Sequence, residues 1–331
     1  MSDGYGEEHG TVTAVRAVTG TTARKARAPE RAEAEETAEA DAERWPGEWV
    51  AKRLDVRLGE ADGLHELLGL ALRRNPRRAH LLVSRVLGKH VPQHPAIVYG
   101  IGLGLGQRVH ELLGQDAGRA VVLGYAETAT GLGHSVADGL ETAVFLHSTR
   151  RAVPGVRPVG GFEEEHSHAT SHLLLPEDPH LLAGDGPLVL VDDEFSTGTT
   201  VLNTIAALHR SFPRERYVIT ALTDLRGEAD RARLTRFAAG LGARVDVVAL
   251  ATGTVRLPAD VLERGRALAE AHDSPPPPPA PGRHEVHRVE LDWPLGVPDG
   301  GRHGFTPDHR ARLEAALPAM AGRIAARLPA G

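Results

Sequence analysis

The sequence LVLVDDEFSTGTT occupies residues 188–200 and decides the predicted fold. Its first four residues are apolar, two acids follow, and a Ser-Thr-Gly-Thr-Thr turn opens a stretch with helical spacing that runs to about residue 210. A strand that is apolar at every position is buried on both faces, which is typical of a parallel sheet covered by helices. The stretch therefore predicts an α/β fold, in which ligands bind at the carboxyl ends of the strands.

The same alternation of short apolar runs and helical spacing continues on both sides of this stretch. We predict a parallel sheet with helices on both faces and three ligand-facing loops, at 124–134, 148–172 and 192–200. The predicted strands are residues 54–58, 80–84, 96–100, 120–124, 144–147, 188–191, 217–222 and 245–250, and the predicted helices are 64–72, a helix through 109–113, 135–140, 199–210, 231–241 and 307–328.

Composition narrows the class of protein. The chain has 331 residues, of which 41% are hydrophobic, a net charge of −6 and no cysteine. Such a length suggests about two domains. The lack of cysteine excludes disulfides and thiolate metal sites and leads us to expect a cytoplasmic protein. Because the chain is not basic and has no apolar run of about 18 residues, we expect neither nucleic acid nor a membrane as a partner.

Changes in composition divide the chain into segments. Residues 1–44 are rich in Ala, Glu, Thr and Arg with few large apolar side chains, and we expect a disordered tail there. Residues 45–255 hold the α/β domain, and 256–282 hold a helix and a stiff proline-rich linker. Residues 283–331 are expected to form a small C-terminal appendage.

The chemistry of the 192–200 loop suits a phosphorylated sugar. The carboxylates of Asp192 and Asp193 accept hydrogen bonds, as a pair of vicinal ribose hydroxyls requires. In the following turn the backbone N–H groups, the hydroxyls and the helix N-terminus all favour a phosphate. An ordinary strand–turn–helix with a capping hydroxyl is the alternative. The residues assigned to the phosphate are Ser196, Thr197, Gly198, Thr199 and Thr200.

The string from Val191 to Thr200 resembles the motif with which type I phosphoribosyltransferases bind phosphoribosyl pyrophosphate (PRPP). Two residues depart from that motif: Glu194 stands where the family usually has an aliphatic residue, and Ser196 where 6-oxopurine enzymes carry an aspartate. The resemblance implies the type I phosphoribosyltransferase fold and transfer of a phosphoribosyl group from PRPP to a nitrogenous base. It also implies Mg²⁺, with Asp192 and Asp193 as catalytic and metal-binding residues.

The resemblance also assigns a loop to the leaving group. Type I enzymes have a pyrophosphate loop after an earlier strand, and residues 124–134 occupy that position here. A flexible turn is the alternative. The residues expected in the loop are Ala126, Thr128, Ala129, Thr130 and Gly131, with Glu127 as a further catalytic candidate.

Basic residues at the end of the 144–147 strand are a further catalytic candidate. In orotate-type enzymes a basic pair at this point faces pyrophosphate, which implies that role for Arg150 and Arg151. Guanidinium groups suit it because they donate two hydrogen bonds side by side. An exposed, charged strand end is the alternative.

Residues 162–172 stand where the family has a mobile loop that excludes water from the site. We expect Glu165, His166 and His168 to belong to such a lid; a solvated loop and a His-x-His metal site are the alternatives. In this fold the N-terminal segment tends to form a hood over the base, which makes Lys89 and His90 candidates for base contacts.

Residues 75–90, 126–133 and 165–168 resemble the phosphoribosyltransferase subfamily found with tellurite-resistance gene clusters. That subfamily usually carries a C-terminal domain named for a Thr-Arg-Ser-Pro (TRSP) motif, and Gly301–Phe305 looks like its start, although the string itself does not occur. We therefore expect residues 283–331 to be a partial TRSP-like segment. The resemblance also implies a homodimer. Two other functions stay open: a non-catalytic PRPP- or nucleotide-binding regulatory module, and the reverse reaction on a nucleotide-like metabolite.

Overall fold

The computed structural model describes residues 45–59, 63–73, 75, 78–141, 144–163, 171–272, 286–298 and 303–328. Backbone contacts divide the chain into Met1–Trp45 and Pro46–Gly331. Apart from Trp45, the first unit lies outside the described residues, and so do the predicted disordered tail and the proline run at 275–279. The second unit holds the fold discussed below.

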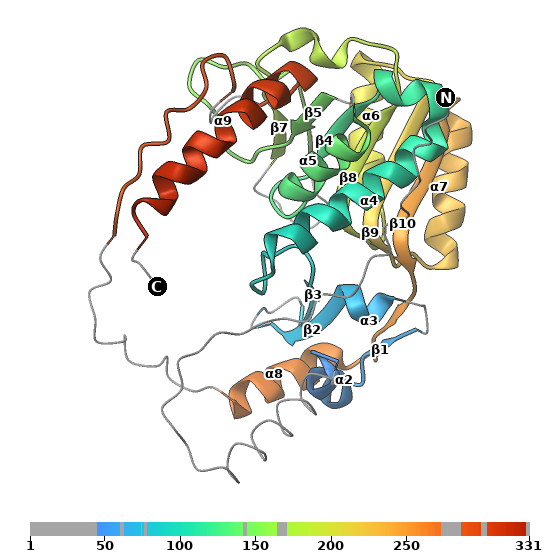
Figure 1. Cartoon of the computed structure of the whole chain (residues 1–331). Helices are drawn as coiled ribbons and strands as arrows, with labels where there is room; N and C mark the ends of the chain where they lie inside the picture. The colour runs from blue at the N-terminus through green and yellow to red at the C-terminus, as the bar shows by residue number, and fades with distance from the viewer. Residues whose placement is uncertain are drawn as a thin grey trace, which may run out of the picture. The chain divides into compact units, whose positions relative to one another are not determined.

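A parallel sheet with the strand order β10-β9-β8-β4-β5 forms the centre of this unit (Figure 1). The apolar half of β8 alternates between two cores, since Val189 and Val191 pack on one face and Leu188 and Leu190 on the other. This double burial is the physical reason for the uninterrupted apolar run. The strands are β4 (Val121–Gly124), β5 (Val144–His147), β8 (Leu188–Phe195), β9 (Arg216–Asp224) and β10 (Arg244–Thr252).

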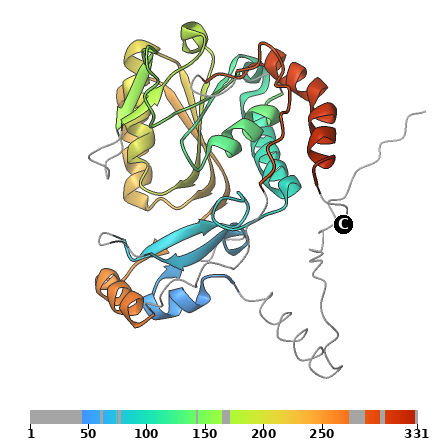
Figure 2. The same cartoon turned by 90° about the vertical axis from the view of Figure 1, so that its left-hand side faces the viewer.

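Helices cover both faces of the sheet, which confirms the predicted α/β class (Figure 2). The core on one face is completed by α4 (Pro95–Leu113) and α5 (Thr130–Gly139). The core on the other face is completed by α6 (Thr199–Ser211) and α7 (Glu228–Leu241). Two short 3-10 helices, η1 (Gly114–Arg119) and η2 (Pro179–Leu182), precede β4 and β8.

The prediction of a strand at 96–100 is wrong, because these residues form the first turns of α4. The β-branched and aromatic run Ile97-Val98-Tyr99 is typical of a strand. The helix starts nevertheless at His94, whose ring accepts a hydrogen bond from the Ala96 N–H, with proline at the first helical position. Further along α4, Gly102 and Gly106 allow α5 to pack closely against the helix backbone.

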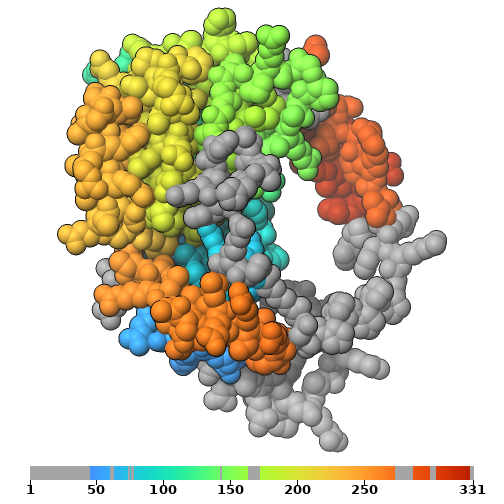
Figure 3. Space-filling view, turned by 180° about the vertical axis from the view of Figure 1, so that it is seen from behind, coloured from blue at the N-terminus to red at the C-terminus, as the bar shows by residue number. Residues whose placement is uncertain are grey.

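A smaller layer, which we call the hood, lies over the carboxyl ends of the strands. It contains an antiparallel pair, β2 (Leu68–Leu72) with β3 (His80–Ser84), and α8 (Val261–Ala271). The prediction of one helix over 64–72 is wrong, because only α3 (Leu64–Leu67) is helical there and β2 follows it. The strand predicted at 54–58 is instead the end of α2 (Glu48–Leu54) followed by the two-residue strand β1 (Arg57–Leu58). Figure 3 shows α8 in orange beside the blue α2. The remaining hood elements are α2 (Glu48–Leu54), β1 (Arg57–Leu58) and β11 (Val255–Arg256).

The long polar segment predicted after β5 contains an antiparallel pair, β6 (Gly160–Glu163) with β7 (Ser171–Leu174). The lid candidates Glu165, His166 and His168 lie between these strands, outside the described residues.

The C-terminal residues attach to the free edge of the sheet. Phe305 forms an antiparallel bridge with Phe145 of β5, and His303 bridges to Pro176. The predicted C-terminal helix is α9 (Pro307–Ala325), and its Arg310 pairs with Asp138 of α5 at 3.4 Å. No helix in the described part of the chain is long and apolar enough to cross a bilayer.

Candidate active site

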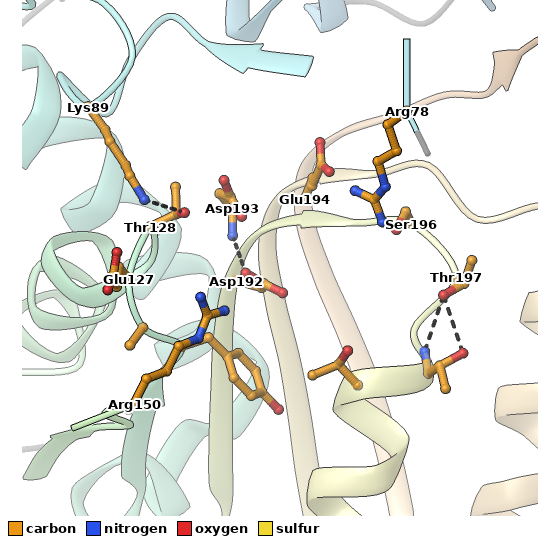
Figure 4. Close-up of a pocket in the computed structure, with 14 residues that line it drawn as sticks. Arg78, Lys89, Glu127, Thr128, Arg150, Asp192, Asp193, Glu194, Ser196 and Thr197 are labelled. Carbon is orange, nitrogen blue, oxygen red and sulfur yellow. Dashed lines mark hydrogen bonds between the residues drawn. The ribbon is translucent and has the colours of Figure 1, made fainter. Parts of the chain in front are cut away.

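A polar cavity opens where β4 stops and β8 continues. β4 pairs with β8 as far as Gly124 and Val191, whereas β9 stays paired with β8 to Phe195. The acids of β8 therefore extend past the end of β4, at the edge of the sheet where ligands bind in α/β folds. The cavity has a volume of about 330 Å³ and is lined by Arg78, Lys89, Tyr125, Ala126, Glu127, Thr128, Arg150, Asp192, Asp193, Glu194, Ser196, Thr197, Thr199 and Thr200 (Figure 4).

Three consecutive acids, Asp192, Asp193 and Glu194, line this first cavity. Asp192 Oδ1 accepts a hydrogen bond of 3.0 Å from the Asp193 N–H. Burial, and next the charge of Asp193, raise the pKa of Asp192 well above its ordinary value. The same two causes raise the pKa of Glu194 to about 7, and the positive charge of Arg78 offsets part of the shift. Three neighbouring carboxyl groups in a partly buried cavity favour a ligand that donates hydrogen bonds or that binds together with a cation.

The turn after β8 is fixed by a glycine and by an arginine from α7. Gly198 has a φ of +79°, and a Cβ there would lie 2.7 Å from Cε2 of the Phe195 ring, so a larger residue would be strained. Arg233 donates to the carbonyl oxygen of Thr197 and, over 3.3 Å, to Thr199 Oγ1. Because α6 begins at Thr199, its first unpaired backbone N–H groups give this end of the cavity a positive potential.

The loop between β4 and α5 forms another wall of the cavity. Its residues 126–128 line the cavity, whereas Ala129 is fully buried and Thr130 and Gly131 belong to the first turn of α5. Lys89 donates from its Nζ to Thr128 Oγ1 over 2.8 Å. In Figure 4 Lys89 and Arg78 enter from opposite sides, so a cation lies on each side of the three acids of β8.

A buried hydrogen-bonded chain connects Arg150 to this loop. Arg150 Nε donates to His172 Nε2 over 3.3 Å, and His172 Nδ1 lies 2.8 Å from Ser148 Oγ. Ser148 Oγ also accepts a hydrogen bond of 2.9 Å from the Ala126 N–H. Both linking side chains, Ser148 and His172, are fully buried. Arg150 is thereby directed into the cavity, whereas its neighbour Arg151 is exposed and is not among the lining residues.

A model of the family described as phosphoribosyl transferase matches residues 67–254, which is more than half of the chain. The chain belongs to this family. The matched region of the phosphoribosyltransferase contains every residue that lines the first cavity. No curated protein matches the chain.

Solved structures with a similar fold include other phosphoribosyltransferases, all of them distant. The adenine phosphoribosyltransferase of Rhodothermus marinus is 18% identical, with a TM-score of 0.39, over 60% of this chain and 98% of that chain. The Trypanosoma brucei adenine enzyme, solved with AMP, pyrophosphate and ribose-5-phosphate, is 15% identical, with a TM-score of 0.40, over 56% and 76%. The orotate enzyme of Aeropyrum pernix is 22% identical, with a TM-score of 0.34, over 60% and 92%.

The phosphoribosyltransferase has a second cavity, of about 550 Å³, which adjoins the first. The two cavities share the lining residues Arg78, Glu194, Ser196 and Thr197. The other walls of the second cavity come from the hood, the loop after β9 and the start of α7, and are made by Ala79, His80, Leu81, Leu82, Leu225, Gly227, Asp230, Val255, Leu257, Val261 and Leu262.

Several residues of the site have no signal in the sequence, and others lie elsewhere than expected. Arg78 belongs to a basic run that is typical of a solvated face, and His172 follows Ser171 at the start of a short strand that ends in two leucines. Lys89, a candidate for base contacts, lies instead against the 126–128 loop, and His90 lines neither cavity. Among the residues that the structure describes, no group of three or more acids or histidines could hold a metal ion by itself.

Proposed function

We propose that this chain transfers the phosphoribosyl group of PRPP to a nitrogenous base or base-like acceptor and releases pyrophosphate. One observation carries the proposal: a single cavity is lined by the acids of β8, the turn that opens α6, the 126–128 loop and Arg150. These parts suit the three portions of PRPP: its ribose hydroxyls, its 5′-phosphate and its pyrophosphate.

The ribose phosphate part of PRPP suits the β8–α6 side of the cavity. The carboxylates of Asp192 and Asp193 can accept hydrogen bonds from the two ribose hydroxyls. The 5′-phosphate fits the turn of residues 196–200, where backbone N–H groups, hydroxyls and the helix dipole all favour an anion. Because the φ of Gly198 and the contacts of Arg233 fix this turn, it needs little reorganisation on binding.

The pyrophosphate part suits the opposite side. Residues 127 and 128 offer backbone N–H groups and the Thr128 hydroxyl, and the cations Lys89 and Arg150 line the same space. Positive charge here stabilises the charge that builds up on pyrophosphate as the bond to the sugar breaks. This proposal includes catalytic roles for Glu127 and Arg151. It also includes Ala129, Thr130 and Gly131, which would support the pyrophosphate loop.

The donor set also fits Mg²⁺. The ion prefers oxygen ligands and usually keeps several waters together with one or two carboxylates and substrate phosphates, and Asp192 and Asp193 supply carboxylates at the wall of the cavity. Bound there with pyrophosphate, the ion would neutralise part of the charge of the leaving group.

In the proposed reaction, the acceptor nitrogen forms a bond to the anomeric carbon as the bond from that carbon to pyrophosphate oxygen breaks. The electron pair of the broken bond leaves with pyrophosphate, and the acceptor proton goes to solvent. The protein contributes mainly by orienting the two reactants and by stabilising charge at both ends of PRPP.

The test is pyrophosphate release from PRPP and Mg²⁺ in the presence of a panel of bases. We expect Asp193→Asn to lower the rate by about two orders of magnitude or more, as the loss of a group that stabilises the transition state does. Asp185→Asn is the matched control, since Asp185 is an exposed carboxylate that lines neither cavity. Full activity of the Asp193 variant, or PRPP binding without turnover of any base, would contradict a catalytic role; the latter result would favour a regulatory binding module.

The finer features that the sequence resemblance implies belong to the same proposal. They are membership of the subfamily found with tellurite-resistance gene clusters, a partial TRSP-like segment at 283–331, a specialised nucleoside-like product, a lid formed by Glu165, His166 and His168, and a cytoplasmic homodimer. The mass of the protein in solution, measured by light scattering, tests the dimer.

A further inference from the structure

The second cavity is continuous with the first through a shared wall. Glu194 near the end of β8 and Ser196 in the turn that follows line both cavities. A compound in the second cavity can therefore reach the sugar held in the first. This cavity is where an acceptor would lie, and the inference below rests on the proposed function.

The walls of the second cavity are aliphatic. They comprise leucines and valines from β3, the loop after β9, β11 and α8, and among the described lining residues the ring of His80 is the one aromatic group. Leu257 is 44% exposed and Leu262 is 37% exposed, so these two large apolar side chains face open space beside the cavity. Covering such surface is favourable for an apolar ligand.

Apart from His80 of β3 and Asp230 of α7, the polar residues of the second cavity gather at its junction with the first. Arg78, Glu194, Ser196 and Thr197 lie there. Asp230 also lines the cavity, but its carboxylate is held by Arg233 at 3.1 Å. A base with donors and acceptors all round its edge would lose hydrogen bonds to water along the aliphatic walls, which is costly. A ligand with one polar end and an apolar body would not lose these hydrogen bonds, because its polar end would lie at the junction.

Part of the aliphatic wall lies outside the region shared with the family. The family match ends at residue 254, and Val255, Leu257, Val261 and Leu262 follow it. Part of the wall that an acceptor would contact is therefore made by residues beyond the family match.

We propose that the acceptor is a nitrogen heterocycle with an alkyl-substituted, largely apolar body, which lies in the second cavity with its ring N–H directed to the Glu194 carboxylate. Glu194 then accepts the hydrogen bond from this N–H and so orients the other, unprotonated ring nitrogen, whose lone pair forms the bond to the sugar. The N–H proton is lost to solvent after the bond has formed. Leu257 and Leu262 act as specificity-determining residues that cover the apolar body.

The experiment compares three probe acceptors with PRPP and Mg²⁺: 5,6-dimethylbenzimidazole, unsubstituted benzimidazole and adenine. Pyrophosphate release and the mass of the product are measured for each. We expect kcat/KM to fall by about tenfold or more from the dimethyl compound to benzimidazole, since methyl groups that fill an apolar pocket contribute on that scale. It should be at least as low for adenine, whose polar edge would lose hydrogen bonds along the aliphatic walls. The inference is overturned if adenine reacts with the same kcat/KM as the dimethyl compound. It is also overturned if the dimethyl compound neither binds nor reacts.

Two variants locate the acceptor. Leu262→Gln should raise the KM for 5,6-dimethylbenzimidazole and leave the Kd of PRPP unchanged. The control Leu317→Gln, at another exposed leucine on α9 outside both cavities, should change neither. Glu194→Gln should lower kcat/KM for the same probe. An unchanged KM in Leu262→Gln overturns the inference while the proposed function stands. Failure of the unmodified protein to bind PRPP would instead contradict the proposed function itself.

Discussion

Ser148 Oγ lies 2.8 Å from Nδ1 of His172, and neither side chain has any exposed surface. The contact joins the end of β5 to β7, and each partner then reaches one element of the cavity: Ser148 the backbone of Ala126, and His172 the guanidinium of Arg150. In the proposed function, His172 is thus a positioning residue for the side of the site that would bind pyrophosphate.

His172→Phe tests this role, because phenylalanine keeps the stacking on Phe162 and removes both hydrogen bonds. We expect the variant to bind Mg-pyrophosphate about tenfold more weakly, on the scale of a lost hydrogen bond to a charged group, and to bind ribose 5-phosphate as before. Calorimetry measures both. His180→Phe, at an exposed position, is the control. Equal losses for the two ligands would mean that His172 only supports the fold.

Arg233→Met should give the opposite pattern. Arg233 holds the turn after β8 through Thr197 and Thr199, so its loss should weaken ribose 5-phosphate binding by about tenfold and leave pyrophosphate binding intact. Arg236→Met is matched in chemistry and lies exposed on the same helix. Ribose 5-phosphate affinity that is identical in the two variants would refute the role given to Arg233.

Only part of the site could be predicted from the sequence, and the contacts of His172 with Arg150 and of Arg233 with Thr197 show why. β8 and its turn were predictable because the run of residues 188–200 is local: double burial makes the strand apolar, and the acids and hydroxyls follow it directly. The partners that position them come from elements far away in the chain. Nothing near His172 or Arg233 in the sequence indicates that they end beside Arg150 and Thr197.

The elements of the fold likewise divide into those that the local sequence predicts and those that tertiary contacts decide. β3 and β5 lie where they were predicted, since short apolar runs bounded by turns are typical of buried strands. The strand predicted at 96–100 is helical because α4 packs on α5, and that tertiary contact outweighs the β propensity of Ile97 and Val98.

Two glycines of α4 provide a matched test of that packing. A Cβ at Gly106 would lie 2.3 Å from the carbonyl oxygen of Val136 on α5, whereas a Cβ at Gly104 would have no neighbour within 4 Å. We expect Gly106→Ala to lower the free energy of unfolding by about 1–3 kcal/mol through overpacking. Gly104→Ala should raise it by up to about 1 kcal/mol, because alanine is the better helix former. Chemical denaturation measures both, and equal effects would contradict the close contact of α4 with α5.

The C-terminal segment should make stability depend on pH. The rings of His147 and His303 have their centroids 3.8 Å apart. Burial, and next the charge of His147, lower the pKa of His303 to about 4, and burial also lowers the pKa of His147. Since the folded protein favours the neutral rings, the stabilisation is complete above the unfolded pKa of about 6.5 and is lost as the pH falls toward 4.

Thermal unfolding between pH 4 and pH 8 tests this dependence. We expect the Tm of the unmodified protein to fall through that window, and the fall to be smaller in His303→Gln, which cannot be protonated. His180→Gln should behave like the unmodified protein. A His303→Gln curve that parallels the unmodified protein would show that the histidine pair is not the titrating element.

The most direct test of the central claim is the affinity for PRPP itself, measured by calorimetry with Mg²⁺ for the unmodified protein and for the variant Asp192→Asn/Asp193→Asn. The amides keep the size of the carboxylates and remove their charge. We predict that PRPP binds to one site and that the double variant binds it at least about tenfold more weakly, as expected when charged hydrogen-bond acceptors of the ribose are lost. Equal affinity of the two proteins, or no binding by the unmodified protein, would show that the end of β8 does not hold the phosphorylated sugar.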